Sequence, residues 1–303
     1  MMEQTDFCGI LSTFCPTILV KYQEPMASHT SFRIGGPSQA MAFPKDEGEL
    51  SALLALAAKE GWPVRILGAG TNVLAPDEGL DGLTICLKDC LDGMKRVNDR
   101  EIEVMAGVTM TRAAVFAAKN GLSGMEFAHG IPGTVGGGVY MNAGAYGGEI
   151  RQVCSQVTVL TRNGEKKILS NGEMGFSYRH SALEDTGDIV LSARFTLTPD
   201  TENAIRERMK ELMAKRSASQ PLDMPSAGSA FKRPVGGYAA ALIDGAGLKG
   251  FAVGGAAIST KHAGFAVNLG GATAADVRGL LSQVSDRVFA QTGIRLEPEV
   301  RIW

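Results

Sequence analysis

The chain has 303 residues, a net charge of −2 at pH 7 and a hydrophobic fraction of 45%. This length is enough for two or three domains with their own cores, and the near-neutral charge gives no basic field of the kind that holds nucleic acid. No apolar run approaches the length of a membrane span. The first residues, including Glu3 and Asp6, lack the apolar stretch of a secretory signal, so we expect a cytoplasmic protein.

The first predicted elements form a small α/β unit over residues 24–88. For residues 1–23, treated as an N-terminal tail, the pattern leaves a short helix and a loose tail open. A helix is predicted over Asp46–Glu60, because Asp46 and Glu49 have capping-box spacing ahead of a leucine stripe. Buried strands are predicted at Val64–Leu67 and Leu83–Leu87.

A second α+β unit is predicted over residues 89–200 and a third over 201–303, with Pro199 marking the boundary between them. Helices are predicted from the cap Thr109 to Asn120, over 201–216 and from Thr273 onward. Strands are predicted at Glu101–Ala106, Val153–Thr161, Glu165–Leu169 and Ile189–Leu197. The expected fold class is therefore α+β with three domains.

Cysteine and histidine usage argues against a disulfide framework and against a metal site. The five cysteines are scattered without a Cys-x-x-Cys pair, and the four histidines lie far apart in the sequence. Neither residue type has the spacing of metal ligands. We therefore expect no bound metal.

Two glycine-rich loops indicate binding of a phosphate-bearing ligand. The first, Gly68-Ala69-Gly70-Thr71-Asn72, follows a predicted strand but lacks the third glycine of a Rossmann fingerprint. Small residues bare backbone N–H groups that bind anions, and Thr71 and Asn72 add side-chain donors. The second loop, Pro132–Gly137, offers another run of exposed N–H groups. Each loop alone is also typical of a tight turn, but the pair suits a clamped pyrophosphate.

A serine beside two cations is the most informative motif. It stands in Pro225-Ser226-Ala227-Gly228-Ser229-Ala230-Phe231-Lys232-Arg233-Pro234. Ser229 has no Gly-x-Ser-x-Gly elbow and no evident histidine base, so hydrolase chemistry fits poorly. A serine beside fixed positive charge is better placed to protonate a developing carbanion. Alone, the motif is also typical of a turn serine that bonds only to backbone.

Taken together, an ordered set of motifs from about residue 24 to the C-terminus resembles the UDP-N-acetylenolpyruvoylglucosamine reductases. These flavoenzymes serve bacterial cell-wall precursor synthesis, and so cell shape and division. Besides the Ser229 stretch and the two glycine loops, the resemblance rests on Thr30–Gly36, Met141-Asn142-Ala143-Gly144, Phe176-Ser177-Tyr178-Arg179, Ala246–Gly250, Ser259–Asn268 and Leu296-Glu297-Pro298-Glu299-Val300-Arg301.

The resemblance implies a fold shared with vanillyl-alcohol oxidase and a bound FAD. No histidine or cysteine stands in either glycine loop, so the FAD is expected to be non-covalent. The implied cofactor-binding residues are Gly68, Ala69, Gly70, Thr71, Asn72, Pro132, Gly133, Thr134, Gly136, Gly137 and Asn142. Thr71 departs from the serine of many relatives but keeps the hydroxyl.

The reaction implied by the resemblance is reduction of an enolpyruvyl ether to a lactyl ether, with NADPH as the hydride donor. Arg179 is implied as the cation on the substrate carboxylate, and a guanidinium suits that role because it binds carboxylates bidentately. Glu299 is implied as the group that stabilises the enolate, with Glu297 as a competing candidate. Ser229 is implied as the proton donor. The sequence leaves the choice between NADPH and NADH open.

The substrate is expected to be a nucleotide sugar with a diphosphate, which requires cations. The candidate substrate-binding residues are Tyr178, Arg216, Lys232 and Arg233. Longer relatives insert a tyrosine-bearing loop after the Tyr-Arg motif; here only residues 180–188 precede the next strand, which resembles the shorter subclass. Two alternatives stay open: a flavin oxidase of the same fold acting on an alcohol or hydroxy acid, and a catalytically silent flavin- or sugar-nucleotide-binding protein.

Overall fold

The computed structural model describes residues 4–303, and these pack as two compact units. Unit 1 comprises residues 4–22, 40–69 and 82–214, and unit 2 comprises residues 23–39, 70–81 and 215–303. Each unit has hydrophobic clusters of its own, and unit 2 assembles stretches that are far apart in the sequence. The predicted division into three contiguous domains stays a prediction.

The N-terminal part of unit 1 is built on a four-stranded sheet with strand order β1-β2-β5-β3. Its strands are β1 (Leu19–Pro25), β2 (Pro37–Phe43), β3 (Val64–Leu67) and β5 (Leu80–Cys86), with β3 and β5 parallel. Helix α2 (Glu47–Glu60) is capped as predicted, because the Asp46 carboxylate accepts a hydrogen bond from the Glu49 N–H at 2.9 Å. Leu50, Leu53 and Ala57 of this helix are fully buried.

The described part of the N-terminal segment takes the helical alternative. Helix α1 (Gln4–Phe14) buries Phe7 and Leu11 in the same core as α2. The Phe7 ring lies 4.2 Å from the Trp62 ring, centroid to centroid. Residues 1–3 of the expected tail, with Glu3, lie outside the described residues.

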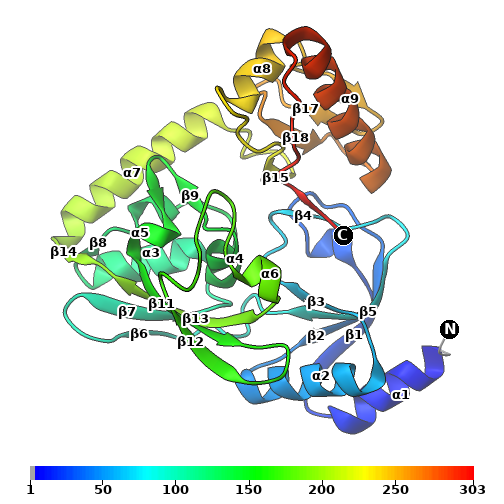
Figure 1. Ribbon diagram of the computed structural model, residues 1–303, viewed down its shortest axis with the longest axis vertical. Coiled ribbons are helices and arrows are strands. Elements are labelled where there is room, and N and C mark those ends of the chain that lie inside the picture. Colours follow the sequence, from blue (N-terminus) through cyan, green and yellow to red (C-terminus); the bar gives the residue numbers. More distant parts are fainter. Residues whose placement is uncertain (1–3) are drawn as a thin grey trace. The chain divides into compact units, whose positions relative to one another are not determined.

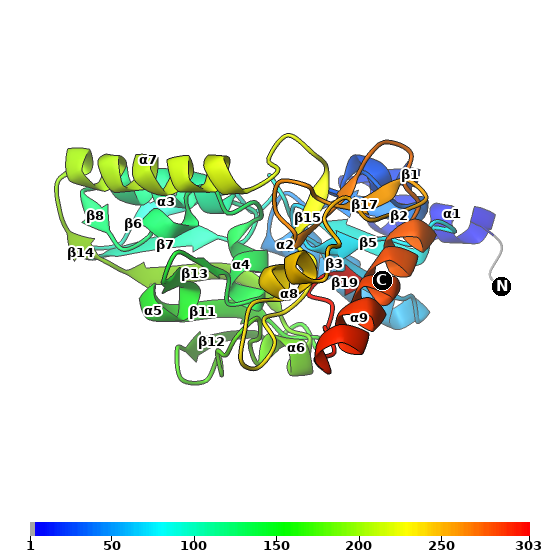
Figure 2. The ribbon, with the colours of Figure 1, turned by 90° about the horizontal axis from the view of Figure 1, so that it is seen from above.

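The second part of unit 1 is a five-stranded antiparallel sheet with strand order β12-β11-β13-β7-β6 (Figure 1). Its strands are β6 (Met94–Arg96), β7 (Glu101–Met105), β11 (Cys154–Leu160), β12 (Lys166–Ser170) and β13 (Ile189–Thr196). Its helices are α3 (Met110–Lys119), α4 (Val135–Tyr140), α5 (Ile150–Val153), α6 (Leu183–Thr186) and α7 (Glu202–Ser219), with the 3-10 turn η2 (Glu126–Ala128). Figure 2 shows α7 alongside α3, where alanines of α3 share a core with Ile205 and Met209 of α7.

Short ladders complete this unit and place its loops. Strands β9 (Gly144–Ala145) and β10 (Gly148–Glu149) form a hairpin, and β8 (Leu122–Ser123) pairs with β14 (Thr198–Pro199). Helix α3 begins after the predicted cap Thr109, whose hydroxyl accepts from the Arg112 N–H.

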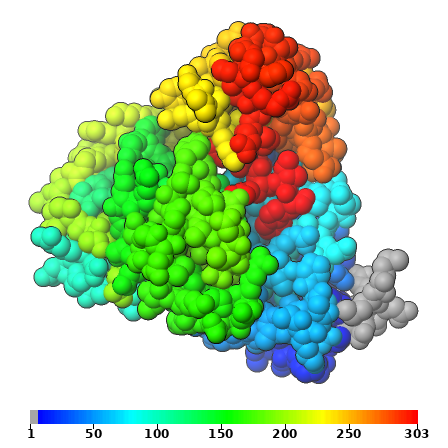
Figure 3. Space-filling view, viewed as in Figure 1, coloured from blue at the N-terminus to red at the C-terminus, as the bar shows by residue number. Residues whose placement is uncertain are grey.

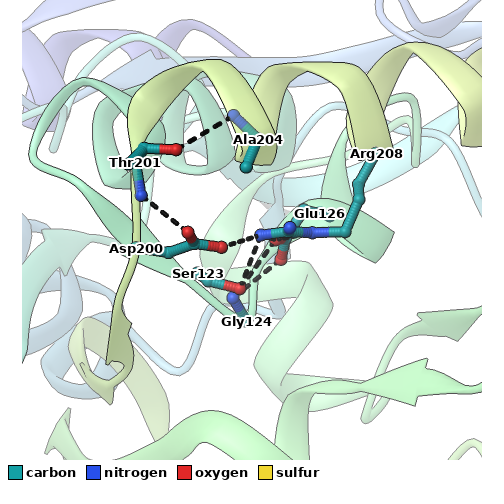
Figure 4. Close-up of polar contacts among 7 residues, drawn as sticks. All are labelled: Ser123, Gly124, Glu126, Asp200, Thr201, Ala204 and Arg208. Carbon is teal, nitrogen blue, oxygen red and sulfur yellow. Dashed lines mark hydrogen bonds and ion pairs between the residues drawn. The ribbon is translucent and has the colours of Figure 1, made fainter.

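An ion-pair network joins the half-exposed Arg208 side chain to buried Glu126 and to Asp200, and fixes the start of α7 (Figure 4). The Arg208 guanidinium donates to Glu126 Oε1 at 2.9 Å, to Asp200 Oδ2 at 2.6 Å and to the Ser123 hydroxyl at 3.1 Å. The second Glu126 oxygen accepts from the Gly124 N–H at 2.7 Å. The network joins residues on both sides of the predicted domain boundary between residues 200 and 201. Unit 1 continues past this boundary to Ala214.

Unit 2 contains a four-stranded antiparallel sheet with strand order β15-β18-β17-β16. The strands are β15 (Ser226–Ser229), β16 (Ala252–Val253), β17 (Ala256–Ile258) and β18 (Phe265–Asn268), and β4 (Val73–Leu74) pairs in parallel with β19 (Arg301–Ile302). Helices α8 (Ala239–Gly245) and α9 (Ala274–Thr292) lie side by side in the space-filling view (Figure 3), and η1 (Met26–Ser28) is a short 3-10 turn. The α9 residues Val277, Leu280 and Val284 are fully buried.

Within residues 4–303, no helix combines the length and apolar character needed to cross a membrane. All five cysteines are free thiols. Among the described residues, no group of three or more histidine, cysteine, aspartate or glutamate side chains is arranged to hold a metal ion.

Candidate active site

The two predicted glycine loops meet in unit 1. Strand β3 ends at Leu67, and Gly68 then lies directly against Thr134, the N-cap of α4. A Cβ atom built on Gly68 would lie 2.6 Å from Thr134 Oγ1, which is closer than real side chains approach. Only glycine therefore lets the two loops touch at this point.

The second loop offers fewer free N–H groups than the sequence predicts. The N–H groups of Val135 and Gly136 donate to the Val108 and Ala106 carbonyls at 2.7 and 2.9 Å, and the Gly137 N–H donates to Thr134 Oγ1 at 3.4 Å. The prediction of a run of exposed donors over Pro132–Gly137 is wrong for these three residues, because Val135 and Gly136 pair with the segment after β7 and the Gly137 N–H is bonded to the helix cap Thr134.

A smaller set of backbone donors remains where the loops meet. Within the described chain, the N–H groups of Gly68, Ala69, Gly133 and Thr134 have no protein acceptor. Backbone N–H groups of this kind, on loops without bulky side chains, bind anions. The donor set therefore fits the pyrophosphate of a dinucleotide cofactor such as FAD.

In unit 2 the segment that directly follows Ser229 lies beside the segment that ends at Glu299. Residues 230–232 pair antiparallel with residues 297–299: the Glu299 N–H donates to the Ala230 carbonyl at 2.9 Å and the Lys232 N–H to the Glu297 carbonyl at 2.8 Å. Phe231 and Pro298 face each other between these bonds. Ser229 ends β15 opposite Phe265, after Gly228 with φ +77°. Ser229, the proton-donor candidate, thus directly precedes the short pairing that contains Glu299, the enolate-stabilising candidate.

The two candidate glutamates have different surroundings. Glu297 is 71% exposed, and its carboxylate forms an ion pair with Lys232 at 2.7 Å. Glu299 is half-buried. The two candidates therefore differ in burial, and Glu297 is the exposed one.

Asn72, a predicted cofactor residue, is bonded to the Glu299 segment. Its amide donates to the Glu299 carbonyl at 3.1 Å, and its own carbonyl accepts from the Arg301 N–H at 3.0 Å. The first glycine loop therefore runs directly into the β4–β19 pairing that holds Glu299.

Arg179 lies in unit 1 on a tight turn. The Ser177 and His180 N–H groups each donate to the other residue's carbonyl, at 3.1 and 3.3 Å, which closes a two-residue turn over Tyr178 and Arg179. Arg179 has φ +56°, a left-handed conformation that costs a non-glycine residue about 1 kcal/mol. Its guanidinium lies 5.3 Å from the centre of the half-exposed Tyr178 ring. The turn is thus held against a backbone preference.

The remaining substrate candidates lie in unit 2. Arg216 is buried, with 7% of its surface exposed, and donates to Gln220 Oε1 at 3.2 Å. The Arg233 guanidinium stacks on the exposed Tyr238 ring at 4.5 Å. Lys232 is engaged with Glu297, as described above.

Sequence reasoning did not anticipate the hydrogen-bond partners of Asn142. Its side chain is buried and bonds to the carbonyl of Ser177 on the Arg179 turn. The Met-Asn-Ala-Gly motif marked the residue, but its partner 35 positions later carries no signal in the sequence.

Comparisons with known proteins agree along the whole chain. Residues 220–303 match the model of the C-terminal domain of UDP-N-acetylenolpyruvoylglucosamine reductase, and residues 38–170 match an FAD-binding domain model. The reductase of Agathobacter rectalis is 46% identical, covering 99% of this chain and 99% of its own length. That of Pediococcus pentosaceus is 45% identical over 100% of this chain and 98% of its own.

A solved structure extends the agreement to the fold. The crystal structure of the reductase from Thermus caldophilus superposes with a TM-score of 0.77 at 35% identity, covering 94% of this chain and 98% of that one. The expected α+β class, with an FAD-binding domain, is confirmed. These likenesses confirm the resemblance carried by the sequence motifs, and the chain belongs to the UDP-N-acetylenolpyruvoylglucosamine reductase family.

Proposed function

We propose that Ser229, Glu299 and Arg179 carry out the reduction of the enolpyruvyl ether of UDP-N-acetylglucosamine. The chain is an FAD-dependent oxidoreductase of peptidoglycan precursor synthesis that uses NADPH, as its family membership and its FAD-binding domain establish. The observation that carries the residue assignment is the ladder that joins the Ser229 strand to the Glu299 segment.

The chemistry that FAD supplies when bound is hydride transfer from NADPH to the terminal enolpyruvyl carbon. Gly68, Ala69, Gly133 and Thr134 would hold its pyrophosphate through their backbone N–H groups. The glycine at position 68 keeps this anion site open, because a side chain there would meet Thr134.

The chain's own residues stabilise the negative charge that develops on the substrate and supply the proton. The Arg179 guanidinium binds the substrate carboxylate, into which negative charge spreads as hydride arrives. Glu299 stabilises the enolate form. Ser229 gives its hydroxyl proton to the carbon next to the carboxylate: the O–H bond breaks, a C–H bond forms, and solvent later returns a proton to the serine oxygen.

Two cations that follow Ser229 closely in the sequence support its role as an acid. Lys232 and Arg233 follow it within four residues, and a nearby cation stabilises the alkoxide left after proton transfer. Arg216, Lys232 and Arg233 are the proposed contacts of the substrate diphosphate, with Tyr178 beside Arg179.

We also propose that the protein works in the cytoplasm without nucleic acid, a membrane or an obligate protein partner. The net charge of −2 supports the absence of a nucleic-acid partner, because binding to phosphate polymers requires a basic surface.

The test is product analysis in deuterated water. Purified protein is mixed anaerobically with NADPH and the enolpyruvyl substrate, and the lactyl ether is examined by NMR and mass spectrometry. Deuterium should appear at the carbon next to the carboxylate, because the serine proton exchanges with solvent. Rapid oxygen consumption by NADPH-reduced protein, with no lactyl ether formed, would instead favour a flavin oxidase.

A further inference from the structure

We propose that Asn142 is a positioning residue that sets the Arg179 turn, rather than a contact of the cofactor. The proposal rests on the proposed role of Arg179 as the carboxylate-binding cation. It concerns residues of unit 1 alone.

The side chain of Asn142 is almost fully engaged within the protein. One amide hydrogen is donated to the Ser177 carbonyl at 2.9 Å and the other to Glu149 Oε2 at 3.0 Å. The amide oxygen accepts from the Arg151 N–H at 2.9 Å. An amide has only two N–H donors, so none is left for a phosphate or a flavin.

The burial and backbone conformation of residue 142 suit an asparagine. Asn142 is 1% exposed and has φ +43°, a left-handed conformation that asparagine tolerates better than other non-glycine residues. Glu149 is held in turn by the Arg151 guanidinium and caps α5 with Gln152. A buried amide with three partners fixed by other elements has one orientation.

The hydrogen bond from Asn142 to Ser177 is made at the residue that closes the Arg179 turn. Ser177 is the first residue of the closed turn, and its carbonyl also accepts from the His180 N–H. The other end is held by the same helix, because the Ser181 hydroxyl donates to the Tyr140 carbonyl at 2.8 Å. Residues at and just after the end of α4 therefore form hydrogen bonds to the chain on both sides of Arg179.

This arrangement explains how a strained turn keeps a single shape. Arg179 at φ +56° occupies a conformation that an isolated turn would leave easily. Loss of the Ser177 bond would let the turn relax and move the guanidinium away from the carboxylate. Helix α4 begins at the glycine-loop contact with Gly68 and ends at this turn, so one short element links the two functional regions of unit 1.

The test compares Asn142→Gly with Asn171→Gly. Glycine keeps the left-handed backbone of residue 142 and removes only the side chain. Asn171 is the matched control, because its amide also donates twice, to the Arg151 and Cys154 carbonyls, but it does not touch the turn. We expect Asn142→Gly to raise KM for the enolpyruvyl substrate by about 10-fold to 10²-fold, the scale of a ~1 Å misplacement.

Three further readouts separate positioning from cofactor binding. In Asn142→Gly, the FAD content and the rate of flavin reduction by NADPH should match the parent protein, and Asn171→Gly should leave KM unchanged. In an Arg179→Ala background, adding Asn142→Gly should change KM little, because both changes act through one group. FAD loss that excess FAD corrects, independent effects in the double variant, or an equal KM rise in Asn171→Gly would each overturn the proposal.

If Asn142→Gly does not fold, Asn142→Asp decides the question, since a carboxylate keeps the size of the side chain but cannot donate to the Ser177 carbonyl. The same KM rise with intact FAD content is expected, and parent-like KM would overturn the proposal. A different result would show that the proposed role of Arg179 itself is wrong: Arg179→Ala alone would then leave KM for the enolpyruvyl substrate unchanged.

Discussion

At the scale of single residues, Ser229 is the proposed proton donor, and its removal should affect only half of the catalytic cycle. Flavin reduction by NADPH precedes proton donation and does not need it. Ser229→Ala should therefore keep near-normal flavin reduction while turnover falls by about 10²–10⁴-fold, the usual contribution of a positioned acid. Rapid mixing separates the two half-reactions: reduction by NADPH and reoxidation by the enolpyruvyl substrate.

Two variants check this assignment. Ser226→Ala removes a hydroxyl from the same strand without touching the proposed acid, so both half-reactions should stay near normal. Ser229→Cys should recover part of the activity, because a thiol also donates a proton. If Ser229→Ala leaves reoxidation intact, Ser229 only shapes the turn.

The two C-terminal glutamates offer a second residue-scale prediction. Glu297 is engaged in an exposed ion pair with Lys232, and such pairs contribute about 0–1 kcal/mol to stability. Glu297→Gln should therefore keep near-normal turnover, whereas Glu299→Gln should lower kcat by about 10²-fold or more, the loss expected for a group that stabilises developing charge. Steady-state rates of both variants, at saturating NADPH, decide between them. The reverse ranking would move the enolate role to Glu297.

At the scale of elements, the contact between β3 and α4 determines whether the anion site can form. Gly68→Ala would place a Cβ atom 2.6 Å from Thr134 Oγ1, whereas Gly137→Ala would place one 3.7 Å from the same oxygen. Overpacking costs about 1–3 kcal/mol, so FAD affinity should fall by about 10-fold to 10²-fold in Gly68→Ala and far less in Gly137→Ala. Titration of apoprotein with FAD measures both. Equal affinities would show that the loops do not need this close approach.

The network at the start of α7 makes a prediction about pH. Burial alone would raise the pKa of Glu126, but hydrogen bonds from the Glu126 and Gly124 N–H groups, the Ser123 hydroxyl and Arg208 lower it below its usual value. A lowered pKa in the folded state gives stability that is present above the unfolded pKa of ~4.3 and is lost as pH falls through the folded value. Glu126→Gln should therefore cost about 1–3 kcal/mol at neutral pH, and less at acid pH.

Denaturant unfolding over a pH series measures this difference. The exposed pair between Glu202 and Arg206, on the same helix, provides the control: Glu202→Gln should cost little at any pH. A Glu126→Gln penalty that stays constant down to the acid limit would mean that the carboxylate charge does not stabilise the fold.

The elements that sequence reasoning located are those with local signals. Helix α2 follows its capping pair, and β3 coincides with the predicted strand. Strand β5 begins at Leu80, before the predicted start at Leu83. The prediction began too late because Gly82, with φ +81°, interrupts the apolar pattern of the sequence. The exposed donors predicted for Val135 and Gly136 fail for a different reason: their acceptors at Val108 and Ala106 are tertiary partners that no local pattern encodes.

At the scale of the whole molecule, the candidate residues are divided between the two compact units. Unit 1 carries the contact of the glycine loops and Arg179, and unit 2 carries Ser229, Glu299 and Arg216. Sequence motifs identified these residues by resemblance, but only the fold shows that Ala230 and Glu299 are bonded, because the two positions are far apart in the chain. Neither unit follows a contiguous segment, so composition and linkers alone could not define them.

The whole chain also predicts how its two substrates are used. It has no Rossmann fingerprint, since Val73 stands where the third glycine would be, so a separate site for the nicotinamide dinucleotide is not encoded by that motif. We therefore expect NADPH and the sugar nucleotide to occupy one site in turn. Initial rates measured at several fixed NADPH concentrations should give parallel double-reciprocal lines, with inhibition at high concentrations of the enolpyruvyl substrate.

The physical reason is that oxidised NADP must leave before the sugar nucleotide can enter, so no complex contains both ligands. Product inhibition provides the control: NADP should compete with the enolpyruvyl substrate for the reduced protein. Arg179→Ala, which weakens only the carboxylate contact, should raise KM for the enolpyruvyl substrate and leave the parallel pattern unchanged. Intersecting lines in the parent protein would require a complex with both ligands bound, and would exclude a single shared site.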